Sequence, residues 1–190
     1  MQILKEEVRE RILEVALGQF AAKGYEGAST REIAAAAGIS KGNLYNYFPG
    51  KEALFDAIVA PFHRDCDAFL SGVIGHVGPE TFSAGSITEA SAGIARFIGL
   101  HRRQFVLLME RSQGTRFARY KGEMIARLRK HFSKNVRREF AKPSLIMGIV
   151  AANFLEAMVS IARNAGATAE AEEAVGLFLR YHMVGVAQFY

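Results

Sequence analysis

The sequence predicts an all-α protein of about nine helices. No stretch alternates apolar and polar residues between hairpin turns, as a half-buried strand would. Apolar residues recur instead three and four positions apart, as in the row of Val8, Ile12, Val15 and Ala16. Half of the 190 residues are hydrophobic and 23% are charged, a balance typical of a globular protein that buries a core.

Glycine, proline and short polar residues place the expected helix boundaries. Gly24 is suited to end the first helix. Ser29 or Thr30, then Ser40, and later Thr168 are suited to cap the starts of others. We expect helices over the ranges 5–23, 31–37, 41–48, 51–73, 87–111, 120–140, 143–166 and 168–189.

Composition favours a protein of the cytoplasm. The single cysteine, Cys66, excludes an internal disulfide and favours a reducing compartment. The first seven residues turn acidic where a secretory signal would be basic and then apolar. The range 143–162 is apolar nearly all round, but Glu156 and many small side chains favour a helix buried in protein. A membrane span is the less favoured alternative, and we expect no membrane partner.

The net charge of +5 is unevenly spread. Residues 1–51 hold seven Lys and Arg against six Asp and Glu, whereas residues 101–142 hold thirteen against three. Apolar residues interrupt the basic stretch, which favours a solvated helix face over a disordered tail. Two functional roles stay open beside that one, namely attraction of DNA and binding of an anionic ligand head group.

Residues 29–51 have the pattern of a helix-turn-helix, two short helices joined by a turn that contains glycine. On a helical wheel Leu44 and Phe48 share one side, suited to pack on the preceding helix. Gly42 and Asn46 lie opposite, between Asn43 and Tyr45. That second face offers donors for phosphates and base edges. By pattern alone, ordinary helix packing explains the segment equally well.

Four pieces of this segment resemble the DNA-binding domain of the tetracycline-repressor (TetR) family. The pieces are Ile33-Ala34, Ala37-Gly38-Ile39-Ser40, Leu44-Tyr45-Asn46-Tyr47-Phe48 and Lys51-Glu52-Ala53-Leu54, all in register. The resemblance covers roughly residues 6–66. It implies a homodimeric transcriptional regulator, usually a repressor, that binds a pseudo-palindromic double-stranded DNA operator and responds to a small-molecule effector.

The resemblance also assigns roles along the chain. It implies a DNA-binding domain over 6–66, with its helix-turn-helix at about 29–48, and a ligand-binding and dimerisation domain over 67–190. Gly42, Asn43 and Asn46 are expected to face the floor of the DNA groove. The candidates expected mainly at phosphates are Thr30, Arg31, Ser40, Tyr45 and Lys51, and Lys41 is a further DNA-binding candidate.

The last two helices, 143–165 and 168–189, are implied to form a four-helix bundle with those of a second copy. The apolar residues that we assign to excess surface there are Ala151, Phe154, Leu155, Met158, Val159, Val175, Phe178, Leu179, Val186 and Phe189. Aromatic and methionine side chains suit an adaptable pocket for an apolar or amphiphilic effector. The candidates for its lining are Phe62, Cys66, Phe69, Phe97, Phe105, Met109, Phe117, Met124 and Met147.

Two other functions compete with DNA binding, namely a helical enzyme and an interaction module that uses the basic face over 101–142. The five histidines and Cys66 show no three residues at metal-ligand spacing, and no phosphate loop or nucleophile elbow is present. We therefore expect no enzyme, cofactor or metal. Pro61 lies inside the helix expected from residue 51, where it is expected to produce a kink, either a hinge for the effector response or static packing.

Overall fold

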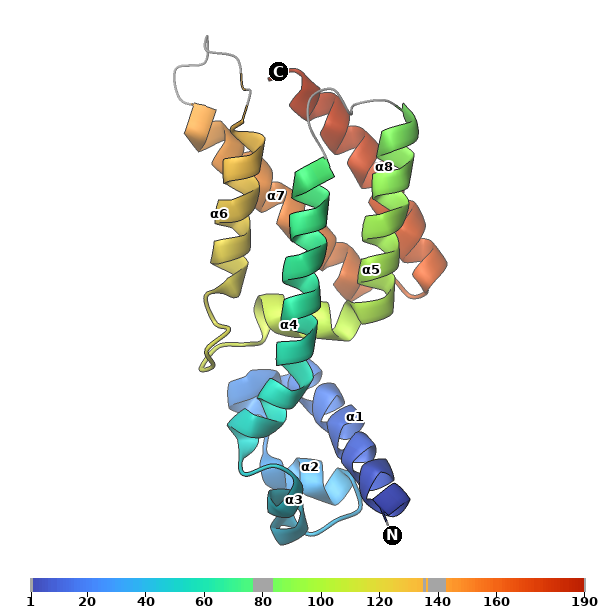
Figure 1. Cartoon of the computed structure of the whole chain (residues 1–190), viewed down its shortest axis with the longest axis vertical. Coiled ribbons are helices and arrows are strands. Elements are labelled where there is room, and N and C mark those ends of the chain that lie inside the picture. Colours follow the sequence, from blue (N-terminus) through green and yellow to red (C-terminus); the bar gives the residue numbers. More distant parts are fainter. Residues whose placement is uncertain (1, 77–83, 135, 137–142, 190) are drawn as a thin grey trace. The chain divides into compact units, whose positions relative to one another are not determined.

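The computed structural model describes residues 2–76, 84–134, 136 and 143–189. These residues form helices and turns, which confirms the all-α prediction with eight helices in place of about nine (Figure 1). The helices are α1 (Gln2–Gly27), α2 (Thr30–Ala36), α3 (Lys41–Tyr47), α4 (Lys51–His76), α5 (Ala84–Glu110), α6 (Tyr120–Phe132), α7 (Pro143–Asn164) and α8 (Thr168–Ala187). The part of the expected helix 120–140 that follows residue 136 lies outside the described residues.

The chain packs as two compact units. The first comprises Met1–Asp65 and Arg103–Arg119, and the second comprises Cys66–Arg102 and Tyr120–Tyr190. The unit that contains the helix-turn-helix therefore also contains 103–119, a segment that the sequence assigns to the second domain. Helices α4 and α5 each contribute residues to both units.

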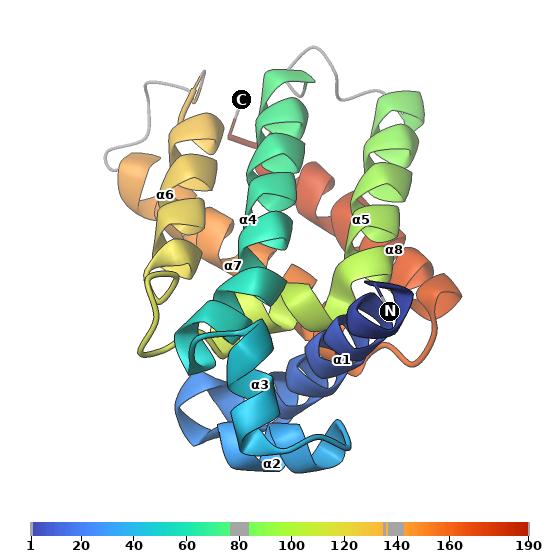
Figure 2. The ribbon, with the colours of Figure 1, turned by 60° about the horizontal axis from the view of Figure 1, so that its bottom comes forward.

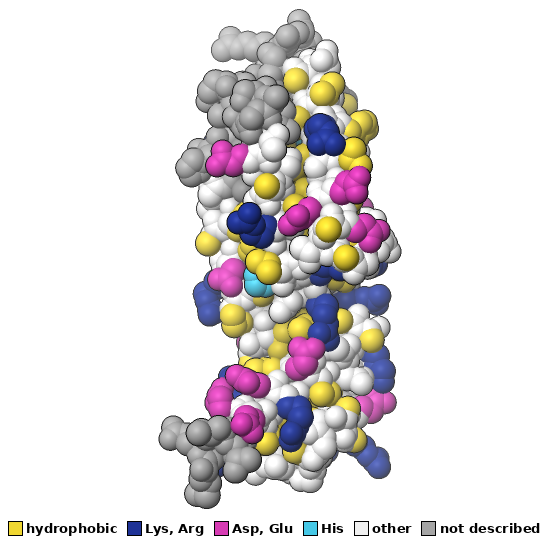
Figure 3. All heavy atoms as spheres, turned by 90° about the vertical axis from the view of Figure 1, so that its right-hand side faces the viewer, with side chains coloured by type: hydrophobic (Ala, Val, Ile, Leu, Met, Phe, Trp, Pro, Cys, Tyr) yellow, Lys and Arg dark blue, Asp and Glu magenta, His cyan; other side chains and the backbone are white. Residues whose placement is uncertain are grey.

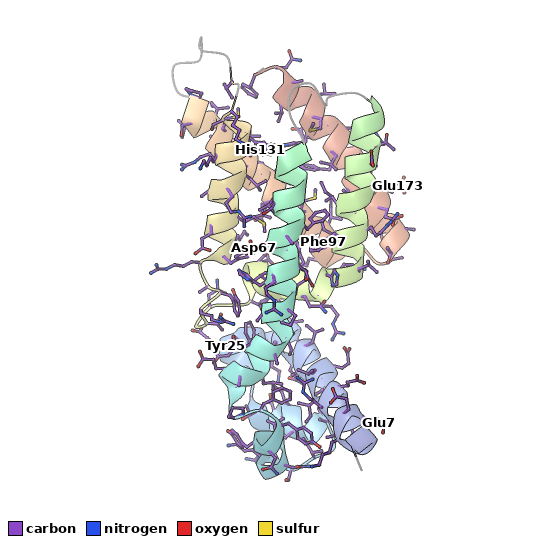
Figure 4. All side chains as sticks on the ribbon, in the orientation of Figure 1. Glu7, Tyr25, Asp67, Phe97, His131 and Glu173 are labelled. Atoms are coloured by element: carbon purple, nitrogen blue, oxygen red, sulfur yellow. The ribbon has the colours of Figure 1, made fainter. Side chains whose placement is uncertain are left out.

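Phe55 of α4 lies at the centre of the first unit's core and is fully buried. Its ring meets those of Phe20 at 5.0 Å, Tyr25 at 5.1 Å and Phe117 at 6.3 Å. The predicted break at Gly24 is present as a positive φ of 72° inside α1. Beyond it the backbone N–H of Tyr25, labelled in Figure 4, donates to the carbonyl of Arg111 at 2.9 Å.

Two of the three predicted helix caps are confirmed. The Ser29 hydroxyl oxygen accepts from the backbone N–H of Arg31, and that of Ser40 accepts from the N–H of Asn43 at 3.1 Å. The predicted cap by Thr168 is wrong, because Ala167 is the N-cap of α8 and makes no side-chain cap. Glu170, in the first turn of α8, accepts instead from the backbone N–H of Gly166 at 2.6 Å, one residue before the N-cap.

In the second unit α7 packs against both α6 and α8 (Figure 1). Its buried side includes Met147, Ala151 and Leu155, continued by Met158, Val159 and Ala162. By length and composition α7 is also apolar enough to cross a membrane, a test that core helices of soluble proteins pass as well. The buried stripe is the packed face that the sequence favours for this segment.

Helix α5 is broken at His101, which has φ −125° and ψ 24°. The next side chain, Arg102, donates from Nε to the carbonyl of Ala162 at 3.1 Å and from Nη1 to that of Gly166 at 3.3 Å, and Nη2 donates to the carbonyl of Ala165. The guanidinium thus occupies the carbonyl end of α7, where a cation is favoured. Helix α4, by contrast with α5, runs as one helix from Lys51 to His76 with Pro61 inside it.

Aromatic side chains from three helices of the second unit surround His182. Its ring centroid lies 4.9 Å from that of Phe154, 5.5 Å from Phe178 and 5.7 Å from Phe132. We call these four residues the aromatic cluster. His182 is only 7% exposed, and this burial lowers the pKa of its imidazole to about 4.

This shift predicts that the second unit loses stability as the pH falls from about 6.5 to about 4. Above that window His182 is neutral in both states. Within it the unfolded chain binds a proton that the folded chain refuses, so the free energy of unfolding falls by up to about 3 kcal/mol. Urea unfolding followed by circular dichroism at several pH values measures this. His182→Phe should reduce the pH dependence and leave the smaller part due to His131, whose pKa burial and Lys134 also lower, whereas His63→Phe in the first unit should keep all of it. Equal slopes for His182→Phe and the unchanged protein would contradict the assignment.

Candidate nucleic-acid interface

Helix α3 is anchored by its buried side on α2 (Figure 2). Leu44 is 1% exposed and Phe48, the C-cap residue, 5%, and on α2 Ile33 and Ala34 are buried as well. Ala37, at the C-cap of α2, completes this apolar contact surface. The anchor that the helical wheel predicts is therefore present, and its burial fixes which side of α3 faces outward.

The outward side of α3 is small, polar and aromatic. Its residues Lys41, Gly42, Asn43, Tyr45 and Asn46 are all exposed. The Lys41 ammonium lies 5.7 Å from the centroid of the Tyr45 ring, a cation–π contact that orders both side chains. One face of a short helix thus presents amides, a phenol and a cation together.

The remaining DNA-binding candidates flank this face, and they differ in exposure and in the hydrogen bonds that they make. Arg31 and Ser40 are exposed and Thr30 is half-buried. Lys51 donates from Nζ to the carbonyls of Glu26 at 3.2 Å and Ala28 at 3.1 Å. Two of its three N–H donors therefore hold the end of α1, and its role at a phosphate stays a prediction.

Two arginines of α1 that the sequence reasoning missed brace the helix-turn-helix. Arg11 Nε donates to the carbonyl of Ala37 at 3.0 Å, at the turn between α2 and α3. The guanidinium of Arg9 lies 5.5 Å from the centroid of the Phe48 ring. Contacts between residues this far apart in the chain leave no local pattern, so only the fold shows them.

The apolar residues assigned to a dimer surface are mostly buried within one chain. Seven of the ten are buried, namely Ala151, Leu155, Met158, Val159, Val175, Leu179 and Val186, and this part of the prediction is wrong. Phe154, Phe178 and Phe189 are half-buried.

The uncovered apolar residues of the last two helices are different ones. On α8 Leu177, Tyr181 and Val184 are 54%, 76% and 68% exposed, and on α7 Leu145 and Ile149 are 59% and 50% exposed. On the side that Figure 3 draws, hydrophobic side chains reach the surface among charged ones of both signs.

The nine residues proposed for one effector pocket divide between the two units. Phe62, Phe105, Met109 and Phe117 belong to the first unit, where they are buried core residues. In the second unit Cys66, Met124 and Met147 are buried, and the half-buried rings of Phe69 and Phe97 stack with centroids 4.3 Å apart. A pocket with these linings stays a prediction.

Much of the basic stretch 101–142 serves the packing of its own unit. Among the described residues of the stretch, those bound to acceptors include Arg102, Arg103, Arg116, Lys121 and Arg127. Arg127, for example, pairs with the carboxylate of Asp67, which also accepts from the Tyr120 hydroxyl at 2.9 Å; Figure 4 labels Asp67 on α4. These contacts weaken the interpretation of the stretch as one continuous docking face.

Among the residues that the structure describes, no group of three or more His, Cys, Asp and Glu is arranged to hold a metal ion. Cys66 is a buried thiol. The Tyr120 pKa is raised, first by burial and then by Cys66 and Asp67. These groups pack within the second unit, and none lies on α3.

Residues 12–58 match the sequence model of the bacterial regulatory proteins of the tetR family. This range of the chain carries a DNA-binding domain of the tetR type. The resemblance read from the helix-turn-helix is thus confirmed, and the matched range includes α2 and α3.

Curated relatives match a limited part of the chain. The transcriptional repressor DhaR of Mycobacterium sp. (strain GP1) is 33% identical over 67 residues, which cover 35% of this chain and 34% of DhaR. The chain thus spans about a third or less of the length of the curated relatives that it matches.

Solved structures extend the likeness of the fold. The ketosteroid transcriptional regulator KstR2 of Mycobacterium tuberculosis superposes with a TM-score of 0.69 at 19% identity, over 93% of each chain. AibR, solved with isovaleryl coenzyme A and operator DNA, gives 0.57 at 21% identity, over 90% of this chain and 97% of its own.

Proposed function

We propose that this chain is a transcriptional regulator of the bacterial cytoplasm, a repressor that binds a pseudo-palindromic DNA operator as a homodimer and releases it when a small effector binds. The observation that carries the proposal is the exposed face of α3, held outward by the buried side chain of Leu44. A helix of this size with an outward polar face fits the major groove.

On this proposal the α3 face divides between base edges and backbone. The absent side chain at Gly42 lets the helix approach the groove floor closely, and the exposed amides of Asn43 and Asn46 are suited to pair with adenine. Thr30, Arg31, Ser40, Lys41 and Tyr45 lie around them and suit phosphate contacts, with Lys51 at the start of α4. Regulators of this kind catalyse no reaction.

Substitution of these amides tests the proposal. Selection from a random DNA library should give a pseudo-palindrome, and on that operator Asn43→Ala or Asn46→Ala should weaken binding by about 1–3 kcal/mol, with relaxed preference at one base position per half-site. Fluorescence anisotropy on single-base operator variants measures both effects. Gln113→Ala, the loss of an exposed amide outside α3, α7 and α8, is the control and should bind normally. If selection recovers no sequence, the chain does not read DNA in this way.

The homodimer is proposed to form through α7 and α8, within the ranges 143–165 and 168–189. Its support is the uncovered apolar surface of these helices, led by Tyr181 and Val184. The two DNA-binding domains of such a dimer are related by a two-fold axis and require two operator half-sites related in the same way, so the proposed operator is pseudo-palindromic. The effector is proposed to bind in the second unit, at the apolar side chains of Cys66, Phe69, Phe97, Met124 and Met147.

A further inference from the structure

The aromatic cluster of Phe132, Phe154, Phe178 and His182 holds a polar atom that its surroundings leave unsatisfied. Nε2 of His182 is buried and has no hydrogen-bond partner among the described residues. A buried nitrogen without a hydrogen bond destabilises the fold, so its presence here calls for an explanation. A bound ligand whose polar group hydrogen-bonds the imidazole would satisfy this nitrogen.

A second imidazole of the same kind adjoins the cluster. His131, labelled on α6 in Figure 4, lies 5.7 Å from the Phe132 ring, and its buried Nδ1 also lacks a partner among the described residues. The three phenylalanines are only half-buried, so the cluster reaches the surface of the second unit. An apolar body among phenyl rings with a polar group at an imidazole is therefore the ligand shape that fits.

The charges around the cluster indicate which polar group the ligand carries. Burial lowers the pKa of both His182 and His131, and Lys134 beyond α6 lowers that of His131 further. Burial alone accounts for the lowered pKa of His182. The side chains that α7 and α8 bring to the cluster are aromatic: Phe154 contacts His182, and Tyr181 contacts Phe178. Among the residues that the structure describes, Lys134 acts on His131 at the margin of the cluster, and its positive charge disfavours a cationic ligand and favours an acidic one.

We propose that the aromatic cluster binds a lipophilic carboxylic acid through the imidazole of His182, and that the acid enters together with one proton. This inference goes beyond the proposed function, because the aromatic cluster shares no residue with the effector site proposed around Phe69 and Phe97. The apolar part of the acid would contact Phe132, Phe154 and Phe178, and its carboxyl group would hydrogen-bond Nε2.

The proton count follows from charge. In water near pH 7 the acid is a carboxylate and His182 is neutral, and a lone carboxylate among phenyl rings would be an uncompensated buried charge. One proton from solvent removes this cost, whether it resides on the carboxyl oxygen or on the imidazole, and no covalent bond forms or breaks. Affinity should therefore rise about tenfold for each unit that the pH falls between 8 and 6.

Calorimetry with 3-phenylpropanoate tests the proposal on the full chain without DNA. Titration at pH 7 in phosphate and in Tris buffer, which differ in ionisation enthalpy, counts the protons taken up. We expect one proton per acid bound, and none for the matched amide, 3-phenylpropanamide. No binding of the acid, or binding without proton uptake, would overturn the proposal.

Variants and a direct observation of the imidazole locate the site. His182→Phe should lower the affinity for the acid at least tenfold, whereas His63→Phe in the first unit should leave it unchanged. Long-range ¹H–¹⁵N correlation spectra of the unchanged protein should show the His182 ring nitrogens shifting as the acid is added, a readout that does not depend on the variant folding. Unmoved His182 nitrogens at saturation would place the acid elsewhere.

The two proposals fail separately. Acid binding with proton uptake in a protein that selects no operator would leave this site standing and remove the regulator function. Operator binding in a protein that takes up no acid would do the reverse.

Discussion

The double variant Tyr181→Glu, Val184→Glu should be a monomer and should bind operator DNA about 1000-fold more weakly than the unchanged protein. Both side chains are more than two-thirds exposed on α8, so the substitutions disturb little of the chain's own core. In an apolar interface four carboxylates per dimer would be buried without partners, which opposes association. The single DNA-binding domain of a monomer then lacks the increase in effective concentration that a second, linked domain provides.

Light scattering coupled to size exclusion measures the assembly, and fluorescence anisotropy on the selected operator measures the affinity. Ala126→Glu places a carboxylate on the exposed side of α6 and serves as the control. It should remain dimeric and bind normally. A dimer that survives both substitutions on α8 would show that the chain associates through another surface.

The same helices show where sequence reasoning ends. Patterning located α7 and α8 correctly as apolar helices, because spacing and glycine breaks are local properties. It chose Leu155, Val175 and Leu179 for the dimer surface, and these are buried within one chain. A helix that is apolar on several sides does not reveal in its own sequence which side meets its own core.

The helix-turn-helix could be predicted more fully. Its caps at Ser29 and Ser40 and its anchor at Leu44 follow from residues within a few positions of one another. The break of α5 at His101 and the three carbonyl contacts of Arg102 had no such signal. Their partners lie about 60 residues along the chain, so only packing determines them.

Phe55→Ala should destabilise the first unit by about 4 kcal/mol. The side chain is fully buried, and the substitution removes a ring that touches Phe20 and Tyr25 of α1 and Phe117 of the segment 103–119. The lost contacts and the cavity left behind both contribute, and the edge-on aromatic pairs add to the burial term.

Since this core holds the end of α1 and the start of α4, the variant should also lose operator binding as the unit unfolds. Urea unfolding followed by circular dichroism gives the change in free energy, and anisotropy at several temperatures shows binding failing together with the fold. Phe55→Leu keeps most of the volume and should cost less than about 1.5 kcal/mol. Phe69→Ala, at a half-buried ring of the second unit, should leave the unfolding of the first unit unchanged. If Phe55→Ala unfolded at the same urea concentration as the unchanged protein, Phe55 would not be the centre of this core.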